Sequence, residues 1–304
     1  MIVYSADYEV DIGSHVFPTS KYRLVREALI ATGHASSSDF MEPPEATRAE
    51  LDLAHDAEYL DDLLDLRPTP RVTRSEMPID AAILRSALLA AGGTLMAARA
   101  ALARRAPAVV HLGGGFHHAF AAHAEGFCFV NDIAVAIAAC RCEGLISRAA
   151  VVDLDVHQGN GTAHIFRDDP AVFTLSIHQE NNYPHKQRSD LDIGLDDGTG
   201  DEPYLAALEG ALPAALAGHR PDLLVYVAGA DPYRDDQLGG LDLTMDGLER
   251  RDRMVLAAAA AHGVPAVVVL AGGYARRVED TVAIHAATAR AALAPAASPP
   301  PANA

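Results

Sequence analysis

The 304-residue chain has little of what marks a secreted or disulfide-built protein. It has three cysteines, Cys128, Cys140 and Cys142. An odd, sparse count argues against a disulfide framework and fits a reducing compartment. Cys140 and Cys142 are two residues apart in an expected helix, where they would not face one another, so they make a poor metal pair. The start, MIVYSADYEVDIG, has neither a basic residue nor a long apolar run, and we therefore expect a cytoplasmic protein.

Long apolar runs, basic residues and several common motifs are also scarce or missing. We expect no membrane span, because the VLAAAAA run ends at His262 after a few turns. Lys and Arg number 24 against 41 Asp and Glu, a formal net charge of −17. This charge disfavours direct nucleic-acid binding and could attract a cationic substrate such as a polyamine or a Lys-rich segment. The chain has no Walker or Rossmann glycine motif and no G-x-S-x-G, which argues against nucleotide binding and serine-hydrolase chemistry.

What the chain does contain is a regular alternation of apolar, β-branched runs with Ala- and Leu-rich helical segments. The expected strands are MIVYS and the runs at 108–112, 149–155, 171–178, 222–231 and 266–274, and the expected helices are 21–31, 80–104, 131–142, 203–217 and 246–262. This alternation predicts a single α/β domain over residues 1–293, with a central parallel sheet flanked by helices on both faces. The Pro/Ala-rich tail, 294–304, is expected to be disordered. Segment 66–78 has no apolar period and is expected to be a surface loop.

Polar residues follow the expected strands at one end. The strands finish in HLGGGFHH, DLDVH, SIH, AGAD and AGGY, and ligands of open parallel sheets bind outside the carboxyl ends of the strands. Asp153, Asp155 and His157 share one parity, so on a strand they would point to the same side. Asp155, His157 and Asp231 form a three-ligand set that is typical of catalytic zinc. Such mixed oxygen and nitrogen ligands would also accept iron(II), and spacing does not decide between the two metals.

Two adjacent histidines and one tyrosine suggest acid–base chemistry beside that metal. His117 and His118 follow three glycines, and one imidazole could take a proton from water while the other protonates a leaving group. Each would need an orienting partner, and Asp153 and Asn160 suit that role. Tyr274, after two glycines, could donate a hydrogen bond to a developing oxyanion.

These motifs together resemble a known family. The stretches HLGGGFHHA, GFCFVNDIAVA, VVDLDVHQGNGT, FTLSIHQENNYP, VYVAGADPYRDDQLGGL and LAGGYAR are similar, in the same order, to those of zinc-dependent histone deacetylases and their bacterial relatives. The resemblance covers most of the chain, including HVFPTSKYRLV near the start, and DVHQGNG followed by DQLGGLDLT is most similar to the class IV branch. It implies the arginase–deacetylase fold and hydrolysis of an N-acyl amide, most familiarly acetyl-lysine, by metal-activated water.

The resemblance also implies roles for individual residues. Zinc, or iron(II), would be held by Asp155, His157 and Asp231. His117 and His118 would be the catalytic pair, with Asp153 supporting His117 and Asn160 supporting His118. Tyr274 would polarise the carbonyl group. In the substrate tunnel, Gly126 would accept the substrate amide through its carbonyl, and Phe127 and Tyr183 would form the walls. A structural K⁺ or Na⁺ would be held by Asp153, Ser176 and the main-chain carbonyls of Asp155, His157 and Ile177.

Two departures from the family pattern affect these expectations. Asn160 stands where class I enzymes carry Asp, and the missing negative charge should lower the pKa of His118. Tyr183 stands at a wall position usually held by Phe, which should make the tunnel more polar.

Other functions are compatible with parts of this pattern. A binuclear manganese ureohydrolase would need further Asp ligands where this chain has Gln158-Gly159-Asn160 and Tyr233, so one metal is expected. A non-catalytic acyl-binding protein would not need the complete set of chemical residues. Among substrates, acetyl-lysine in a protein, acetylated polyamines, long-chain acyl-lysine and small amides all remain open, because loops 66–78 and 178–190 select none of them. The oligomeric state is not indicated.

Overall fold

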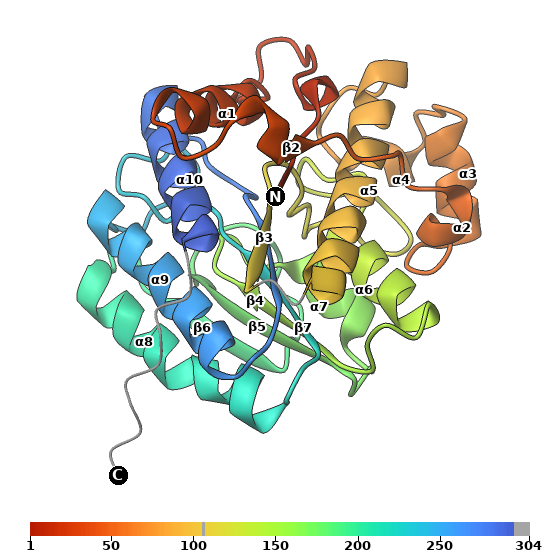
Figure 1. Ribbon diagram of the computed structural model, residues 1–304. Helices are drawn as coiled ribbons and strands as arrows, with labels where there is room; N and C mark the ends of the chain where they lie inside the picture. The colour runs from red at the N-terminus through yellow and green to blue at the C-terminus, as the bar shows by residue number, and fades with distance from the viewer. Residues whose placement is uncertain (105–106, 295–304) are drawn as a thin grey trace.

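The computed structural model describes residues 1–104 and 107–294 and has one eight-stranded, all-parallel sheet (Figure 1). The strands are β1 (Ile2–Val3), β2 (Phe40–Met41), β3 (Ala108–His111), β4 (Ala149–Asp153), β5 (Val172–Gln179), β6 (Leu191–Leu195), β7 (Leu223–Val227) and β8 (Ala266–Val269). They lie in the order β2-β1-β3-β8-β7-β4-β5-β6. The predicted α/β class with a central parallel sheet is confirmed. Except for Ala294, the tail that we expected to be disordered lies outside the described residues.

Helices cover both faces of this sheet, as predicted. The helices are α1 (Lys21–Ala31), α2 (Arg48–Leu51), α3 (Ala57–Leu64), α4 (Pro70–Thr73), α5 (Ala81–Arg104), α6 (Asp132–Cys142), α7 (Asn160–Phe166), α8 (Asp201–Pro213), α9 (Met245–Ala261) and α10 (Val278–Leu293), with short 3₁₀ turns at Ala6–Tyr8 and Ser37–Asp39 and a π turn at Ala214–Gly218. Figure 1 shows α1, α8, α9 and α10 on one side of the strands and α2 to α7 on the other.

Each face of the sheet has its own hydrophobic core, because successive strand residues point to opposite faces. On β7, Leu224 and Tyr226 pack with α1, α8, α9 and α10, whereas Leu223 and Val225 pack with α2, α3, α5 and α6. The strands are therefore buried on both faces, which is why their sequences read as continuous apolar runs.

Several expected boundaries were wrong. The strands at 149–155, 222–231 and 266–274 are shorter than expected and end at Asp153, Val227 and Val269. Strands β2 and β6, the two edges of the sheet, were not expected. β2 is only two residues long, and β6, with the sequence LDIGL, contains Asp and Gly. The expected helices agree within a few residues, but α10 and the shorter α2, α3, α4 and α7 were not predicted.

Two expectations about single segments need correction. Segment 66–78 is not only a surface loop, because it contains α4, and Val72 and Ser75 are fully buried. By length and composition, residues 81–103 of α5 are also sufficient to cross a membrane, which we did not expect. This is weak evidence for a span, since 61% of the most apolar 18-residue window is buried within the fold, as in the core helix of a globular protein.

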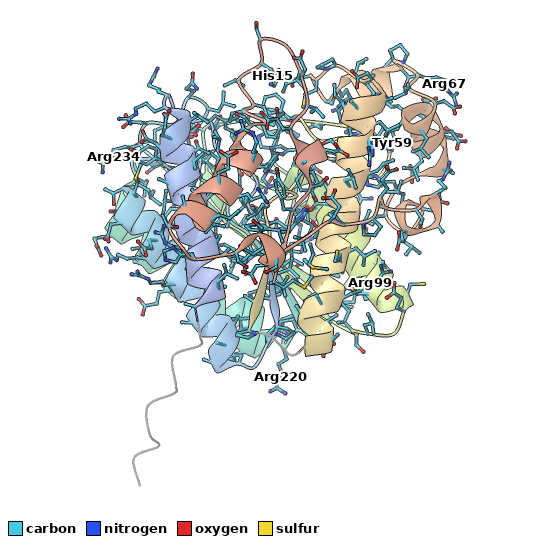
Figure 2. The ribbon with its side chains drawn as sticks, turned by 45° about the horizontal axis from the view of Figure 1, so that its top comes forward. His15, Tyr59, Arg67, Arg99, Arg220 and Arg234 are labelled. Atoms are coloured by element: carbon cyan, nitrogen blue, oxygen red, sulfur yellow. The ribbon has the colours of Figure 1, made fainter. Side chains whose placement is uncertain are left out.

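The register of the sheet brings the chemical residues together. His111, Val269, Val227, Asp153 and Ser176 are partners in one row across five neighbouring strands. In β3, β4, β7 and β8 this row is the last residue of the strand, whereas β5 runs on to Gln179, and the loops with the candidate residues follow at the carboxyl ends. Figure 2 shows the two ends of the molecule: His15 lies at the loop end near these segments, and Arg220, just before β7, lies at the opposite end.

Candidate active site

Three side chains converge in the arrangement expected of a metal site. Candidate ligand atoms of Asp155, His157 and Asp231 all lie within 4.8 Å of one another, and the three residues are buried. His157 Nδ1 is 3.1 Å from Asp155 Oδ1 and 3.3 Å from Asp231 Oδ2. Within residues 1–104 and 107–294, this is the one group of three or more His, Cys, Asp or Glu side chains that converges in this way. One metal ion per chain stays a prediction.

Backbone hydrogen bonds fix the carboxylates of Asp155 and Asp231 in positions that suit a bound cation. Asp155 Oδ2 accepts a hydrogen bond from Gly272 N at 2.9 Å, and Asp231 Oδ1 accepts one from Val156 N at 2.9 Å. Asp231 Oδ2 is buried and has no hydrogen-bond partner among the described residues. Burial lowers the pKa of His157, but Asp155 and Asp231 outweigh it and raise the pKa to about 10. A site that attracts a proton this strongly, and leaves one oxygen unpaired, fits a divalent cation.

The strand that leads into this site ends earlier than the parity argument assumed. β4 ends at Asp153, so Asp155 and His157 lie in the loop behind it and do not share a strand face with Asp153. Asp153 points to His117 instead, while Asp155 and His157 face Asp231. Asp153, the last residue of the strand, therefore serves His117, while Asp155 and His157, just after the strand, belong to the metal cluster.

Side chains from the start of α6 hold the histidine pair in place. Asp132 accepts hydrogen bonds from Gly115 N at 3.0 Å and Phe116 N at 2.7 Å. The neighbouring Asn131 caps α6 and donates from Nδ2 to Ala119 O at 3.0 Å. These bonds anchor the loop on both sides of the pair, which explains why the sequence places Asn and Asp at the start of an otherwise apolar helix.

Each histidine has the partner that we predicted. His117 Nδ1 is 2.7 Å from Asp153 Oδ2, and His118 Nδ1 is 2.7 Å from Asn160 Oδ1. Burial lowers the pKa of His117, but Asp153 and Asp155 outweigh it and raise the pKa to about 9. Burial, with the neighbouring His117 and His157, holds the pKa of His118 well below its ordinary value. The surroundings of the two imidazoles therefore differ: the carboxylates favour the protonated form of His117, whereas burial and the neighbouring imidazoles favour the neutral form of His118.

Tyr274 lines the same inner cavity as the two histidines. It lines both the inner cavity and the outer channel described below. Its backbone N donates to Asp236 Oδ2 at 2.7 Å, and Gln237 Nε2 donates to its carbonyl at 2.8 Å. Burial, followed by the nearby Asp155 and Asp231, raises the pKa of Tyr274 well above its ordinary value, so the hydroxyl keeps its proton.

A narrow channel connects these groups to the surface. A small inner cavity of about 20 Å³ is lined by side chains that include His117, His118, Asp155 and His157. An outer cavity of about 260 Å³ shares His118, Gly126, Phe127 and His157 with it and adds Glu76, Asn182, Tyr183 and Leu238. The structure thus places all three predicted tunnel residues in the channel lining.

The tunnel residues are shaped by a tight turn. Gly126 and Phe127 both have positive φ, +50° and +66°, and the ring of Tyr183 lies 5.1 Å from that of His118. A side chain at Gly126 would collide with His118 and the Tyr183 hydroxyl, because its Cβ would be 2.6 and 2.7 Å from them. The Gly126 carbonyl accepts a hydrogen bond from Cys128 Sγ at 3.2 Å.

The residues expected to bind a monovalent cation come from β4, β5 and the loop after β4. Asp153 and Ser176 are register partners on β4 and β5, and both are buried. Ser176 Oγ is 2.9 Å from His178 Nδ1. Asp153 thus ends β4 while Ser176 lies within β5, and a K⁺ or Na⁺ site there stays a prediction.

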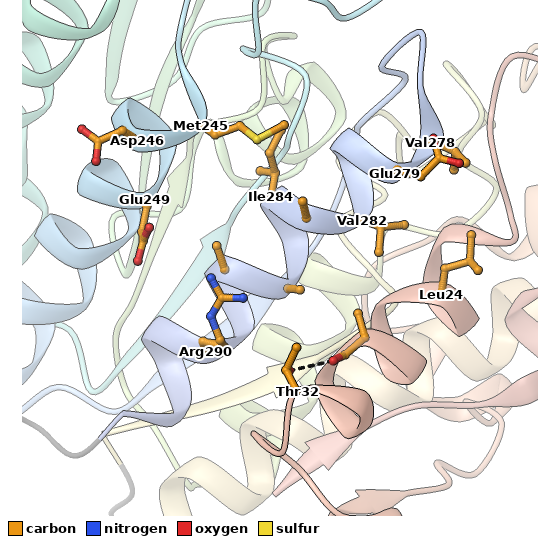
Figure 3. A pocket seen from close by; sticks show the side chains of 14 residues that line it. Leu24, Thr32, Met245, Asp246, Glu249, Val278, Glu279, Val282, Ile284 and Arg290 are labelled. Atoms are coloured by element: carbon orange, nitrogen blue, oxygen red, sulfur yellow. Dashed lines mark hydrogen bonds between the residues drawn. The ribbon is translucent and has the colours of Figure 1, made fainter.

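A larger cavity than this channel lies elsewhere. It measures about 600 Å³ and lies between α1, α9 and α10, where Leu24, Met245, Val282 and Ile284 are among its lining residues (Figure 3). Its acidic groups are Asp246, Glu249 and Glu279, without a nearby histidine or cysteine in the lining. Volume is therefore a poor guide to the chemistry of this protein.

Two residues near the site were not singled out from the sequence. Lys21 is fully buried; its Nζ donates to Ala271 O at 2.6 Å and lies 5.7 Å from the centre of the Tyr274 ring. Burial lowers the pKa of Lys21, nearby carboxylates raise it, and the net result is a pKa of about 8. Glu125 contacts Asn160 and Arg74. No sequence signal marks Lys21, because a lysine in an amphipathic helix normally reaches solvent. Glu125 could have been noticed, because it directly precedes the predicted tunnel residue Gly126.

Comparison with known proteins agrees with this geometry. Residues 15–289 match the histone deacetylase domain. The chain belongs to the histone deacetylase family. It is 31% identical to histone deacetylase 2 of Arabidopsis thaliana, covering 92% of this chain and 77% of that protein. It is 33% identical to the histone deacetylase-like amidohydrolase of Pseudomonas aeruginosa, covering 84% and 71% respectively.

Family membership extends to the fold and to the general reaction. An uncharacterised protein of Picosynechococcus sp. is 42% identical over 96% of this chain and 97% of its own length. The crystal structure of the HDA15 HD domain superposes with a TM-score of 0.80 at 25% identity, covering 96% of this chain and 90% of that one. The arginase–deacetylase fold is therefore confirmed, and the family supports a deacetylase or amidohydrolase activity.

Proposed function

We propose that this protein removes an acetyl or longer acyl group from an N-acyl-lysine, or from a related N-acyl amine, by hydrolysis. One observation carries the proposal: Asp155 and His157 of the three-ligand cluster, two separately partnered imidazoles and Tyr274 line one inner cavity at the end of a channel. An acyl amide on an extended stem fits that shape, because the stem would occupy the channel and the amide would reach the cavity.

Asp155, His157 and Asp231 would hold the metal. We propose zinc, with iron(II) as the alternative that these ligands also accept. A bound divalent cation supplies a Lewis acid for the amide carbonyl and makes water a better nucleophile at neutral pH.

The protein's own groups would supply the proton transfers. His118 is held neutral and can accept a proton at Nε2, since its Nδ1 is engaged by Asn160. His117 shares a short hydrogen bond with Asp153, which favours a positive charge on its ring next to the developing negative charge. The proton that His118 takes from water would pass to the amine nitrogen as the C–N bond breaks. The Tyr274 hydroxyl would donate to the carbonyl oxygen as that oxygen becomes an oxyanion.

The channel would orient the substrate. The Gly126 carbonyl would accept the amide N–H, and Phe127 and Tyr183 would cover the apolar stem. Glu76 at the channel lining and the formal charge of −17 favour a cationic substrate beyond that stem. Both a Lys-containing peptide and an acetylated polyamine have that character, and the polyamine is our alternative substrate.

An acyl-release assay tests the proposal. Lysine peptides with acyl chains of increasing length and acetylpolyamines would be offered to the metal-loaded protein, with metal-stripped protein as control. We expect release from at least one class, lost on stripping and restored by zinc or iron(II). A fully metal-loaded protein that releases no acyl group from any of them would contradict the proposed reaction, and a preference for acetylpolyamines would favour the alternative.

A further inference from the structure

Glu125 occupies a fixed position beside the histidine pair. It begins the tight turn that carries Gly126 and Phe127, and the turn is closed by Glu125 N to Cys128 O at 3.0 Å and Cys128 N to Glu125 O at 2.8 Å. Positive φ at both central residues is the signature of a type I′ turn, whose shape leaves little freedom to its first residue. Phe127 N also donates to Ser75 O at 2.8 Å, which fastens the turn to the segment after α4.

The side chain of Glu125 contacts the partner of His118. Only 12% of it is exposed, and its Oε1 accepts a hydrogen bond from Asn160 Nδ2 at 2.9 Å. Its other oxygen, Oε2, accepts from Arg74 Nη2 at 2.7 Å and lies 3.7 Å from His123 Nδ1. A continuous chain of contacts therefore runs from the exposed Arg74 through Glu125 and Asn160 to His118.

The chemistry of these groups permits one orientation of the amide. An ionised carboxylate only accepts hydrogen bonds, so Asn160 must present its NH₂ group to Glu125. Its oxygen then faces His118 Nδ1, and Nδ1 must carry the proton. In the neutral ring, Nε2 keeps its lone pair and can act as a base. Without Glu125, the amide could turn by 180° and donate its N–H to His118 Nδ1. The ring proton would then be on Nε2, and Nε2 could not act as a base.

The two histidines differ in this respect. His117 is paired directly with Asp153, and a carboxylate can only accept, so the tautomer of His117 is set without further help. His118 is paired with an amide, which can donate or accept. We propose that Glu125 is a positioning residue that fixes the Asn160 amide and thereby holds His118 as its Nδ1–H tautomer. This inference deepens the proposed hydrolysis and rests on it for its catalytic consequence.

The direct test compares three variants in the metal-loaded protein. Glu125→Gln keeps the size but can both donate and accept, so both amide orientations become possible. Adding Asn160→Asp restores an acceptor-only partner for His118, to which the amide introduced at position 125 can donate. Glu58→Gln is the matched control, because Glu58 forms a 2.8 Å ion pair with Arg71 at the same segment and does not contact Asn160.

The first readout does not depend on activity. In ¹⁵N-histidine NMR spectra, with the His118 signals assigned by difference from His118→Gln, we expect a pure Nδ1–H tautomer in the wild type and in Glu58→Gln. Glu125→Gln should give a mixture, and Glu125→Gln/Asn160→Asp should return to Nδ1–H. A pure Nδ1–H tautomer in Glu125→Gln would overturn the proposal.

The second readout is kinetic. On the best acyl substrate, Glu125→Gln should lower kcat roughly 10-fold with KM within about twofold, as for loss of an outer partner of a catalytic group, and the double variant should recover most of kcat. A merely structural role for Glu125 would not be rescued by Asn160→Asp, so failure of the rescue counts against the proposal. If no acyl amide is hydrolysed while the tautomers change as expected, the proposed function fails and the role of Glu125 stands.

Discussion

Gly272 offers the sharpest test of the metal site, because its missing side chain leaves the space that the ligands need. A Cβ at this position would lie 2.1 Å from Asp231 Oδ2 and 2.5 Å from Asp155 Oδ2. Cβ contacts below 3.0 Å essentially never occur, so in Gly272→Ala the carboxylate or the backbone must shift by about 1 Å in a close-packed interior. Gly272 is not among the glycines with positive φ, so the substitution adds a clash and no backbone strain.

The expected effect is selective. A shift of about 1 Å in a catalytic group costs roughly 10²-fold in rate, and we expect kcat/KM to fall by at least that factor. Metal affinity should weaken by roughly 10- to 100-fold. Overpacking should cost about 1–3 kcal/mol in the free energy of unfolding, which leaves a stable domain folded.

The measurement is a metal titration followed by acyl-release kinetics at saturating metal. Gly210→Ala is the matched control: a Cβ at Gly210 in α8 meets nothing within 4 Å, so this variant should keep metal affinity and activity and gain roughly 0.5–1 kcal/mol in stability. If Gly272→Ala binds metal as tightly as the wild type and retains full activity, the three residues do not form the metal site as described.

Three further predictions address the ligands, the oxyanion donor and pH. Asp231→Asn should remove most metal binding and all activity. Metal analysis of the wild type should give one divalent ion per chain at the active centre, and two such ions would revive the binuclear manganese alternative. Tyr274→Phe deletes only the hydroxyl, so kcat should fall roughly 10²–10³-fold with little change in KM or metal content; near-full turnover would refute the role of Tyr274. Burial lowers the pKa of His55 to about 4, so the unfolded chain binds this proton at a higher pH than the folded protein, and stability is lost as pH falls from about 6.5 to about 4. Urea unfolding should show a loss of about 2 kcal/mol from this group between pH 7 and 5 that His55→Gln lacks, and equal losses in both proteins would exclude His55 as the source.

The sequence by itself determined the sheet, its parallel character and the kinds of side chain at its carboxyl edge. Buried parallel strands must be continuously apolar, so their ends are visible as the points where Gly, Asp and His begin. The ligand set Asp155, His157 and Asp231 was predictable for the same reason. The edge strands β2 and β6 were not, because a strand that is two residues long or contains Asp and Gly carries no such signal.

The tertiary structure alone decided where the strand ends and which groups surround the predicted site. β4 ends at Asp153, not at Asp155, so Asp155 and His157 reach the metal cluster from the loop after the strand and not from a strand face. The buried Lys21 and the Glu125–Asn160–His118 chain depend on segments far apart in the sequence that meet only in the folded protein. A sequence pattern reports which groups are available at a sheet edge, whereas hydrogen-bond partners and cavities arise from loop packing, which follows no local period.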